Sequence, residues 1–404
     1  MRVPVRGIFL AVLLAACTTP PPVTVPTPTP TRTPDTLSVT ALLDLTGPLE
    51  PVGVAQRNAM QLWLDQAQQR PPGAVRIRVK FVDVAGSSTR LVIELRRAVV
   101  DDRADAVIVG SSAQPDDAFA GAVALAAVPV LLTVPAADVT GTAGGWLFGL
   151  APTPADIATV LVSDMIDRRV AAPAAVLIDG SRPALVERSA LLAALAEQAR
   201  PLPEVVDVSG PRAVERAKLA AANGRSLTVL GPAHTYADEL REIRADTART
   251  LYLSYLTEAT DLAEARGTGM TIRWPGLRAL VETPPSPRPL RTAFLQGYTD
   301  RHGPPSATAA TAYDALGLIG AAAERDPRQI DPARLRQSLE TRTFAGVVTE
   351  YAFAPTRRSP FDRRGLAMLA PDARGLPGLA PSPSPSPSAS PSATPTASPA
   401  GTGR

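Results

Sequence analysis

Residues 75–110 read VRIRVKFVDVAGSSTRLVIELRRAVVDDRADAVIVG, and this stretch decides the fold class. Apolar and charged residues alternate over Val75 to Val84, which is the pattern of a half-buried strand. Ser88 to Asp102 follows with helical spacing behind candidate caps at 87–89, and Ala106 to Val109 is a short apolar run. Strand, helix and strand in this order predict a parallel βαβ unit.

The same alternation of strand and helix continues along the chain. Leu37 to Leu45 is predicted as a strand, and Gln56 to Gln69 carries apolar residues at helical spacing. Further short apolar runs, each followed by a helical stretch, lie at 128–133, 174–178, 227–230 and 250–253. Repeated units of this kind predict an α/β fold whose parallel sheets are covered by helices on both faces. Ligands of such sheets bind at the carboxyl ends of the strands.

The N-terminus has the order of a secretory signal peptide, here residues 1–17. Arg2 and Arg6 precede an apolar run from Ile8 to Leu14, which is shorter than the roughly 20 residues of a membrane span. The following Leu14-Ala15-Ala16-Cys17 resembles the lipobox of bacterial lipoproteins. The resemblance implies that Cys17, the only cysteine, is acylated and anchors the chain to the lipid bilayer.

Two biased segments flank the body of the chain. Residues 18–35 are rich in Pro and Thr and predict a polyproline stalk, and residues 373–404 predict a disordered Pro/Ser-rich tail. The whole chain has 41 basic and 38 acidic residues, so its charge is nearly balanced. Because the basic residues are scattered among acidic ones, the composition gives no reason to expect nucleic acid as a partner.

Several short motifs, in their order along the chain, resemble one known family. They are Leu43-Asp44-Leu45-Thr46-Gly47-Pro48 with Gly53, similar to a "PLTGP…G" loop, then Val107 to Ser112, Val134-Pro135-Ala136-Ala137, Ala312-Tyr313-Asp314-Ala315 and Phe344-Ala345-Gly346-Val347. The family is the type I periplasmic binding proteins of the Leu/Ile/Val-binding class. No one motif is specific alone, but together they cover most of the chain.

The resemblance implies two Rossmann-like lobes joined by a hinge that the chain crosses three times. The first lobe is expected at 36–152 with 285–340, and the second at 153–284 with 341–372. A small polar solute binds in the cleft, closes the lobes and is delivered to an ABC permease in the membrane. The implied protein is extracytoplasmic and monomeric, and its solute is an amino acid, an amide or a related compound.

The resemblance also implies the first-lobe contacts of the solute. Ser111 and Ser112 in one turn, then Ala136, Ala137 and Asp138 in another, would hold its charged ends, because free amides and hydroxyls at helix N-termini suit a carboxylate. The alternative is that the serines only cap a helix beginning near Gln114. Asp138 stands where amino-acid binders place Thr, so it either caps the next turn, or the solute offers a cation or a neutral donor there.

The second lobe departs from the amino-acid pattern. Asp179-Gly180 replaces a Tyr-Gly pair, and Ala233-His234 replaces a ligand-contacting Tyr. Tyr255 occupies the neighbourhood of the usual acid, with Glu258 slightly beyond it, and Val52 stands where an aromatic residue commonly lines the side-chain pocket. We therefore expect Val52, Asp179 and Tyr255 at the site, with the class of solute left open.

An enzyme is not expected. The only histidines are His234 and His302, no residues have zinc-ligand spacing, and neither a nucleophile-elbow nor a phosphate-loop motif occurs. We expect no metal and no cofactor, and we read His234 as a loop residue with satisfied hydrogen bonds. The alternative function is a degenerate binding-protein fold that acts as sensor or regulator of an envelope partner.

The lipobox generates the first testable prediction. Cys17→Ser should remain an unprocessed precursor without the lipid-dependent gain in mass, because the acylated thiol is removed. Labelling with radioactive fatty acid in a lipoprotein-competent host measures this. A wild-type protein that takes up no label would contradict the anchor.

Overall fold

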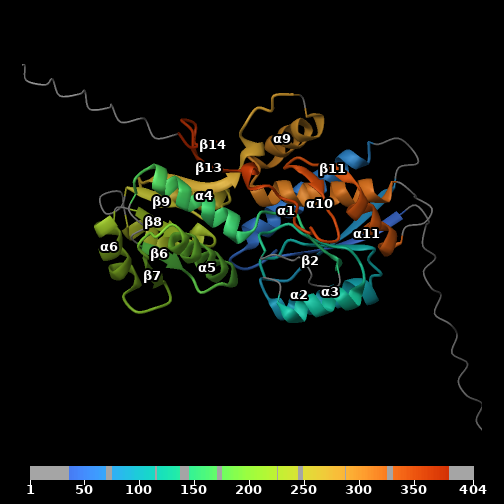
Figure 1. The fold of residues 1–404 in the computed structure, drawn as a ribbon, viewed down its shortest axis with the longest axis horizontal. Helices are drawn as coiled ribbons and strands as arrows, with labels where there is room; N and C mark the ends of the chain where they lie inside the picture. Colours follow the sequence, from blue (N-terminus) through green and yellow to red (C-terminus); the bar gives the residue numbers. More distant parts are fainter. Residues whose placement is uncertain are drawn as a thin grey trace, which may run out of the picture. The chain divides into compact units, whose positions relative to one another are not determined.

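The computed structural model describes residues 36–69, 75–113, 116–136, 145–170, 175–224, 226–243, 249–286, 288–324 and 331–381 (Figure 1). The predicted signal peptide with Cys17, the stalk, Ala137, Asp138 and residues 382–404 lie outside this set. Two large sheets dominate the described part, one parallel and one parallel except at one edge, in line with the predicted alternation of strands and helices.

The first sheet has five parallel strands in the order β2-β1-β3-β4-β5. Its strands and the helices between them are β1 (Thr36–Leu43), α1 (Glu50–Ala67), β2 (Arg76–Asp83), α2 (Ser88–Val100), β3 (Ala106–Val109), α3 (Asp117–Ala126), β4 (Val130–Leu132) and β5 (Leu147–Gly149). The quoted stretch 75–110 thus forms β2, α2 and β3. Because β1 lies between β2 and β3, the unit crosses over one strand.

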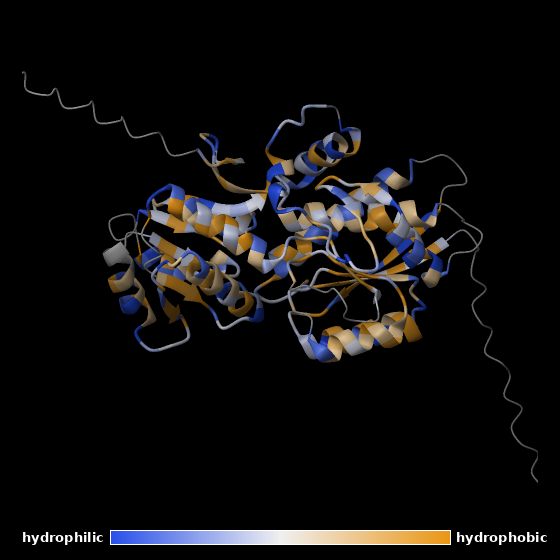
Figure 2. Ribbon diagram, in the orientation of Figure 1, coloured by the Kyte–Doolittle hydropathy of each residue, from blue (hydrophilic) through white to orange (hydrophobic). Residues whose placement is uncertain are grey.

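Both faces of the first sheet are apolar. On β3, Ala106 and Ile108 belong to a cluster with α1 and α10 (Ala307–Ala323), whereas Val107 and Val109 face α2 and α3. Colouring by hydropathy shows apolar residues along the strands, whereas the helices carry both apolar and polar residues (Figure 2). Short continuous apolar strands are expected where helices cover both sides of a sheet.

The second sheet has seven strands in the order β14-β13-β10-β9-β8-β6-β7. Its elements are α4 (Pro154–Asp167), β6 (Ala175–Ile178), α5 (Arg182–Glu197), β7 (Glu204–Asp207), α6 (Ala213–Gly224), β8 (Ser226–Val229), η2 (Ala233–Tyr236), α7 (Ala237–Glu242), β9 (Thr250–Tyr252), α8 (Ala259–Arg266), β10 (Thr271–Leu277), β13 (Leu366–Pro371) and β14 (Pro377–Leu379). β13 and β14 are antiparallel additions at one edge. Residues 377–379, which the sequence placed in the tail, are therefore a strand.

The chain passes between the two groups of elements three times. It leaves the first sheet after β5, returns after η3 (Arg278–Leu280) and leaves again before β13. In the returning segment are α9 (Pro289–His302), α10, α11 (Pro332–Thr341), β11 (Thr343–Ala345) and β12 (Glu350–Ala352), and a turn of 3-10 helix, η4 (Arg363–Gly365), precedes β13. Phe344 and Tyr351 pack in the same cluster as α1 and α10, although the sequence assigned 341–372 to the second lobe.

The helix starts match local chemistry. Ser87 caps α2 as predicted, since its hydroxyl accepts from the Arg90 amide at 3.2 Å. The helix expected near Gln114 instead begins at Asp117, because the Asp116 carboxylate accepts from the Phe119 amide at 2.8 Å. The alternative that Ser111 and Ser112 cap this helix is therefore wrong.

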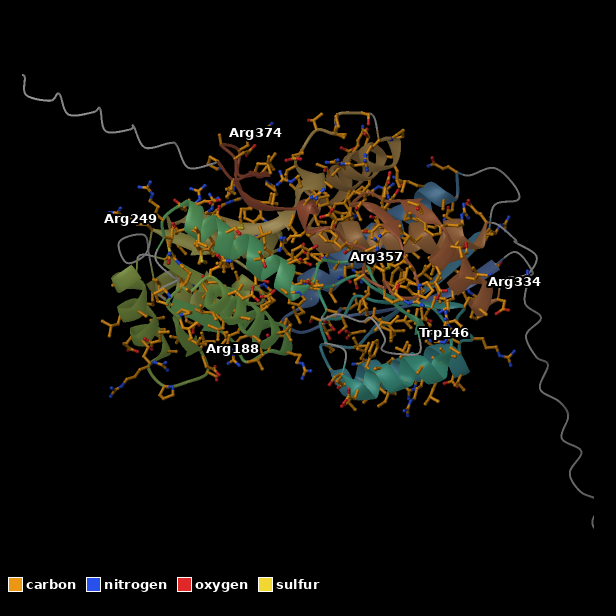
Figure 3. All side chains as sticks on the ribbon, in the orientation of Figure 1. Trp146, Arg188, Arg249, Arg334, Arg357 and Arg374 are labelled. Atoms are coloured by element: carbon orange, nitrogen blue, oxygen red, sulfur yellow. The ribbon has the colours of Figure 1, made fainter. Side chains whose placement is uncertain are left out.

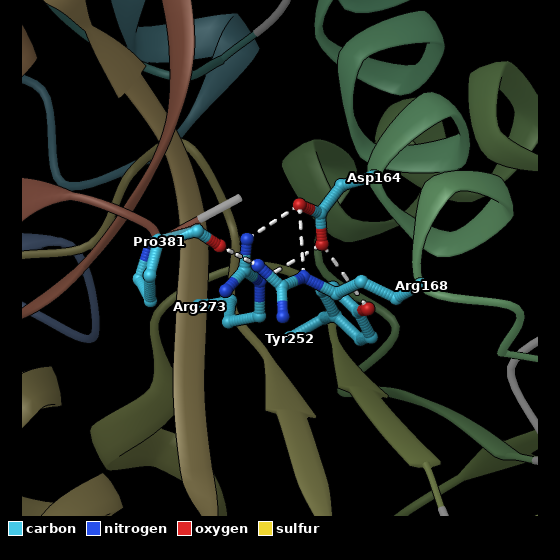
Figure 4. Close-up of polar contacts among 5 residues, drawn as sticks. All are labelled: Asp164, Arg168, Tyr252, Arg273 and Pro381. Carbon is cyan, nitrogen blue, oxygen red and sulfur yellow. Dashed lines mark hydrogen bonds and ion pairs between the residues drawn. The ribbon is translucent and has the colours of Figure 1, made fainter. Parts of the chain in front are cut away.

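Asp164 joins α4 to the second sheet (Figure 4). The guanidinium of Arg273, on β10 and 2% exposed, donates to both of its carboxylate oxygens, and the Tyr252 hydroxyl donates to it at 3.3 Å. Arg168 also donates to Asp164 and to the carbonyl of Pro381, the last described residue. A buried arginine is stable here only because its charge is paired and hydrogen-bonded.

We predict that Asp164→Ala lowers the free energy of unfolding by roughly 3–5 kcal/mol, because it leaves the Arg273 charge buried without its partner. Urea unfolding followed by circular dichroism measures the change. Asp167→Ala, at an exposed position of the same helix, is the matched control and should change stability by no more than about 0.5 kcal/mol. Equal effects of the two variants would contradict the role of the pair.

Candidate solute-binding site

A small cavity lies where the loops after strands of both sheets meet. Its lining residues are Ser112, Val134, Pro135, Pro154, Pro183, Val186, Glu187 and Leu256. Ser112 follows β3 and Pro135 follows β4, whereas Pro183 and Glu187 lie on α5 after β6, and Leu256 follows β9. The volume of about 10 Å³ has room for about one water molecule. This is the edge at which α/β sheets bind ligands.

The carboxylate of Asp44, directly after β1, organises the first-sheet side of this site. Its Oδ1 accepts from the Ser111 hydroxyl and the Gly86 amide, both at 2.7 Å. Its Oδ2 accepts from the amide and the hydroxyl of Ser112, both at 3.0 Å. Asp44, Ser111 and Ser112 are each no more than 2% exposed. The turn predicted to hold a solute is thus held by a side chain of the protein itself.

A glycine on α1 permits this arrangement. A Cβ at Gly53 would lie 1.9 Å from the carbonyl oxygen of Asp44, which is far inside the contact distance. The glycine of the quoted motif therefore has a steric reason, because the first turns of α1 pass directly over the Asp44 backbone. A side chain there would push α1 away from the end of β1.

Glu187 is the one acidic side chain in the cavity lining. It accepts from the Ser254 hydroxyl at 2.5 Å and from the Gly231 amide at 2.9 Å. The pKa of the Glu187 carboxyl is raised to about 7, mainly by desolvation and also by the nearby charge of Asp179, while its two hydrogen bonds oppose the rise. Near neutral pH this group therefore exchanges between its acid and its carboxylate form.

The structure brings only some of the predicted residues to the cavity. Ser112 lines it, and Ser111 lies behind Ser112. Val52 is 2% exposed in the apolar cluster of α1, so it packs in the core rather than in the cavity lining. Ala136 is half-buried beside the α2–α3 cluster. Asp138 and Ala137 lie outside the described residues.

Asp179 and Tyr255 are near the site without lining this cavity. Asp179 accepts from the Ser181 amide at 2.9 Å and so shapes the turn into α5. Tyr255 is 2% exposed, and its hydroxyl has no hydrogen-bond partner among the described residues. It lines a neighbouring cavity of about 20 Å³ together with Glu187.

Two polar contacts join the two groups of elements. His234 of the second group contacts Pro48 of the first, and Glu258 of the second contacts Thr308 of the first. Nδ1 of His234 lies 2.7 Å from Asp261, and the carbonyl of Pro48 also accepts from its ring. The hydrogen bond with Asp261 raises the pKa of His234, against the effect of burial. Glu258 accepts from the Thr308 hydroxyl of α10 at 2.8 Å, and burial raises its pKa to about 8. His234 is thus hydrogen-bonded, as the sequence reading expected.

A larger cavity of about 450 Å³ lies elsewhere, beside β10, α8 and α9. Its wall includes Trp274, Leu277, Leu262 and Leu295, with Glu258 on one side. Although this cavity is larger, it does not include the Ser111–Ser112 turn or Glu187. We therefore take the small cavity at the strand ends as the candidate site.

Sequence reasoning missed the two acids that define the site. Asp44 stands inside the quoted loop motif, at the position where that motif has Pro, and this departure was the available signal. Glu187 follows Val186 in a helix with no clear apolar face, and nothing in its local sequence distinguishes it from a solvated residue. Only the packing of α5 brings it to the cavity.

The basic residues show no concentration at the site. The labelled arginines belong to separate elements: Arg188 to α5, Arg334 to α11 and Arg374 to the β13–β14 turn (Figure 3). Over the described ranges, no group of three or more His, Cys, Asp or Glu residues could hold a metal ion. No helix in the same ranges is long and apolar enough to cross a membrane.

Comparison with known proteins identifies the family. A family model described as periplasmic binding protein matches residues 36–364. The chain belongs to the periplasmic binding protein family. No curated protein matches this periplasmic binding protein in sequence. The predicted resemblance to the type I class and the predicted two-sheet α/β fold are both confirmed.

Solved structures share the fold at low identity. A type 1 periplasmic binding protein from Bordetella pertussis is 18% identical with a TM-score of 0.69, covering 86% of this chain and 99% of its own. A solute-binding protein of an ABC transporter from Rhodopseudomonas palustris, in complex with benzoate, is 15% identical with a TM-score of 0.69, covering 85% and 96%. LivJ from Streptococcus pneumoniae, in complex with isoleucine, is 16% identical with a TM-score of 0.66, covering 85% and 99%.

The raised pKa of Glu187 generates a prediction on stability. Between its ordinary pKa of 4.5 and about 7, the unfolded chain releases a proton that the folded protein keeps, so stability falls as pH rises. Glu187→Gln lacks this loss, and Gln can still accept from Gly231 and donate to Ser254. Relative to wild type, it should gain up to about 3 kcal/mol between about pH 5 and pH 8.

Denaturant unfolding at the two pH values measures this gain. Glu197→Gln, at an exposed position near the end of α5, is the matched control and should follow wild type. If Glu187→Gln and wild type lose stability in parallel, the proton at Glu187 is not the cause.

Proposed function

We propose that this chain is an extracytoplasmic solute-binding lipoprotein of an ABC importer. It binds a small polar solute between its two sheets and delivers it to a membrane permease. The observation that carries the proposal is the cavity that is lined by loops after strands of both sheets and includes the Ser112 turn. Family membership supports it, because the family consists of substrate-binding proteins rather than enzymes.

The three passages of the chain between the sheets support a hinged mechanism. Only short segments join the two groups of elements, so one group can rotate against the other with small changes in few residues. The hydrogen bonds of His234 with Pro48 and of Glu258 with Thr308 favour an arrangement in which the groups lie close. A solute that contacts both sides would shift the population in the same direction.

Attachment and delivery are further parts of the proposal. Acylation of Cys17 would hold the protein at the membrane, and residues 18–35 would separate the body from the bilayer. The protein would act as a monomer that presents its closed form to the permease. Asp138, Ala136 and Ala137 remain candidate solute contacts on the first-lobe side, and Asp179 and Tyr255 on the second.

One observation favours the alternative of a sensor or regulator of an envelope partner. The cavity of about 10 Å³ is far smaller than the several hundred Å³ of an ordinary ligand pocket. Apolar side chains such as Val134, Pro183 and Leu256 occupy much of the space between the two sides. A solute-binding protein must open this contact, whereas a regulator could keep it closed.

Binding of a solute distinguishes the two functions. We screen amino acids, amides, small peptides and polyamines by thermal shift, because a solute at 100 times its dissociation constant adds about 2.7 kcal/mol to stability. Small-angle scattering with and without the best solute then measures the radius of gyration, which should decrease on closure. A proven solute with an unchanged radius, or no stabilising solute at all, would favour the regulator.

A further inference from the structure

The donor protons of the Ser111–Ser112 turn are used within the protein. A serine hydroxyl has one proton to donate, and a backbone amide has one. Both hydroxyl protons and the Ser112 amide proton are directed at Asp44, together with the amide of Gly86. The hydroxyl oxygens keep lone pairs, so toward the cavity Ser112 can only accept a hydrogen bond.

This changes the chemistry of the turn. By resemblance to the family, its donors would hold the carboxylate of an amino-acid solute. Here an internal carboxylate has taken that place. A solute carboxylate against Ser112 Oγ would also approach the charge of Asp44, because Asp44 Oδ2 lies 3.0 Å behind that oxygen. Two like charges about 6 Å apart at an effective dielectric near 20 weaken binding on the order of 100-fold.

The opposite wall has the same sign of charge. Glu187 lines the cavity from α5, and Asp179 lies close enough to raise its pKa. Among the described residues, no lysine or arginine forms an ion pair with Asp44, Asp179 or Glu187. The cavity between Ser112 and Glu187 is the size of one water molecule, which is also about the size of an ammonium group.

We infer that the solute presents a protonated amine to this cavity, with Ser112 Oγ and the Glu187 carboxylate as acceptors and Asp44 as the charge behind them. The inference rests on the proposed solute-binding function and names the class of its solute. A group with three N–H donors matches the two acceptors, Ser112 Oγ and the Glu187 carboxylate. An α-carboxylate held by the Ser111–Ser112 turn does not.

Two matched pairs of probes test the charge preference in the full chain. Isoleucine and benzoate are the ligands seen in two similar structures. Calorimetry compares isoleucine with 2-methylbutylamine, which lacks the carboxylate, and benzoate with benzylamine, which has an amine in its place. Each amine should bind at least about tenfold more tightly than its partner. Its affinity should rise as pH increases through about 7, where Glu187 ionises. Acids that bind as tightly as the amines, or failure of both amines, would overturn the inference.

Substitution of Asp44 tests the mechanism. Asp44→Asn should weaken amine binding about tenfold or more, since it removes the charge behind Ser112. Asp83→Asn is the matched control: Asp83 ends β2 at the same sheet edge but binds Leu45, Thr46 and Ala85 instead of the serine turn. It should change amine affinity less than threefold. Equal losses in both variants would show a general effect of charge and overturn the role of Asp44.

Chemical rescue gives a readout that needs no solute. Asp44→Ala frees the serine donors, so acetate should raise its melting temperature more than chloride at equal ionic strength, and should not do so for wild type. No acetate-specific effect would overturn the reading of the turn as an occupied carboxylate site. If Asp44→Ala does not fold, the Asp44→Asn comparison decides.

Failure of the inference and failure of the proposed function give different results. Binding of benzoate or isoleucine to wild type at least as tightly as the matched amine would overturn the amine assignment and support a solute-binding protein. The other outcome is that acetate rescues Asp44→Ala while no compound in the thermal-shift screen stabilises wild type. That result would support the interpretation that Asp44 occupies a carboxylate site, and it would count against a transport function.

Discussion

The carboxylate of Asp44 holds together the edge of the first sheet on which the site depends. It is bound to the loops after β1, β2 and β3 at once, through Gly86, Ser111 and Ser112. Parallel strands end at one edge, and their loops carry free amides that must be satisfied when they are buried. In this protein the Asp44 side chain provides the acceptor for the Gly86 amide and for the Ser111 and Ser112 donors, so these groups are hydrogen-bonded before any solute arrives.

Because the acceptor at this edge is a carboxylate, it also places negative charge close to the cavity. The buried carboxylate of Asp44 accepts only from neutral donors among the described residues, and Glu187 lines the cavity that Ser112 lines in front of Asp44. Burial raises the pKa of Glu187 to about 7, so the second wall changes its charge near neutral pH. The site therefore has the Asp44 carboxylate behind Ser112 on one side and the Glu187 carboxyl group on the other.

Two further acidic side chains, on α10 and α11, stabilise the segment that returns to the first sheet. Asp314 on α10 accepts from the Val347 and Val348 amides at 2.7 and 2.9 Å, and burial raises its pKa to about 7. Glu340 on α11 instead binds the guanidinium groups of Arg336 and Arg358, which help to lower its pKa against the effect of burial. These contacts hold the parts of the returning segment to one another.

The sequence by itself determined the fold class and most of the first sheet. Apolar runs such as Ala106 to Val109 cannot avoid burial on both faces, and the helices between them follow from spacing and caps such as Ser87. It did not reveal β10, because Arg273, Pro275 and Gly276 interrupt the apolar pattern and a strand with a buried arginine makes sense only beside Asp164. Local pattern carries no information about such a partner 109 positions away.

Only the tertiary structure decided what the site offers. The sequence pointed to Ser111 and Ser112 but not to the direction of their protons, which depends on Asp44 reaching them from another strand. It placed Val52 at a side-chain pocket, whereas α1 turns that residue into the core. Glu187 became a cavity residue through the docking of α5. Periodicity records which residues are buried, but donors and acceptors find their partners only when separate strands and helices are packed together.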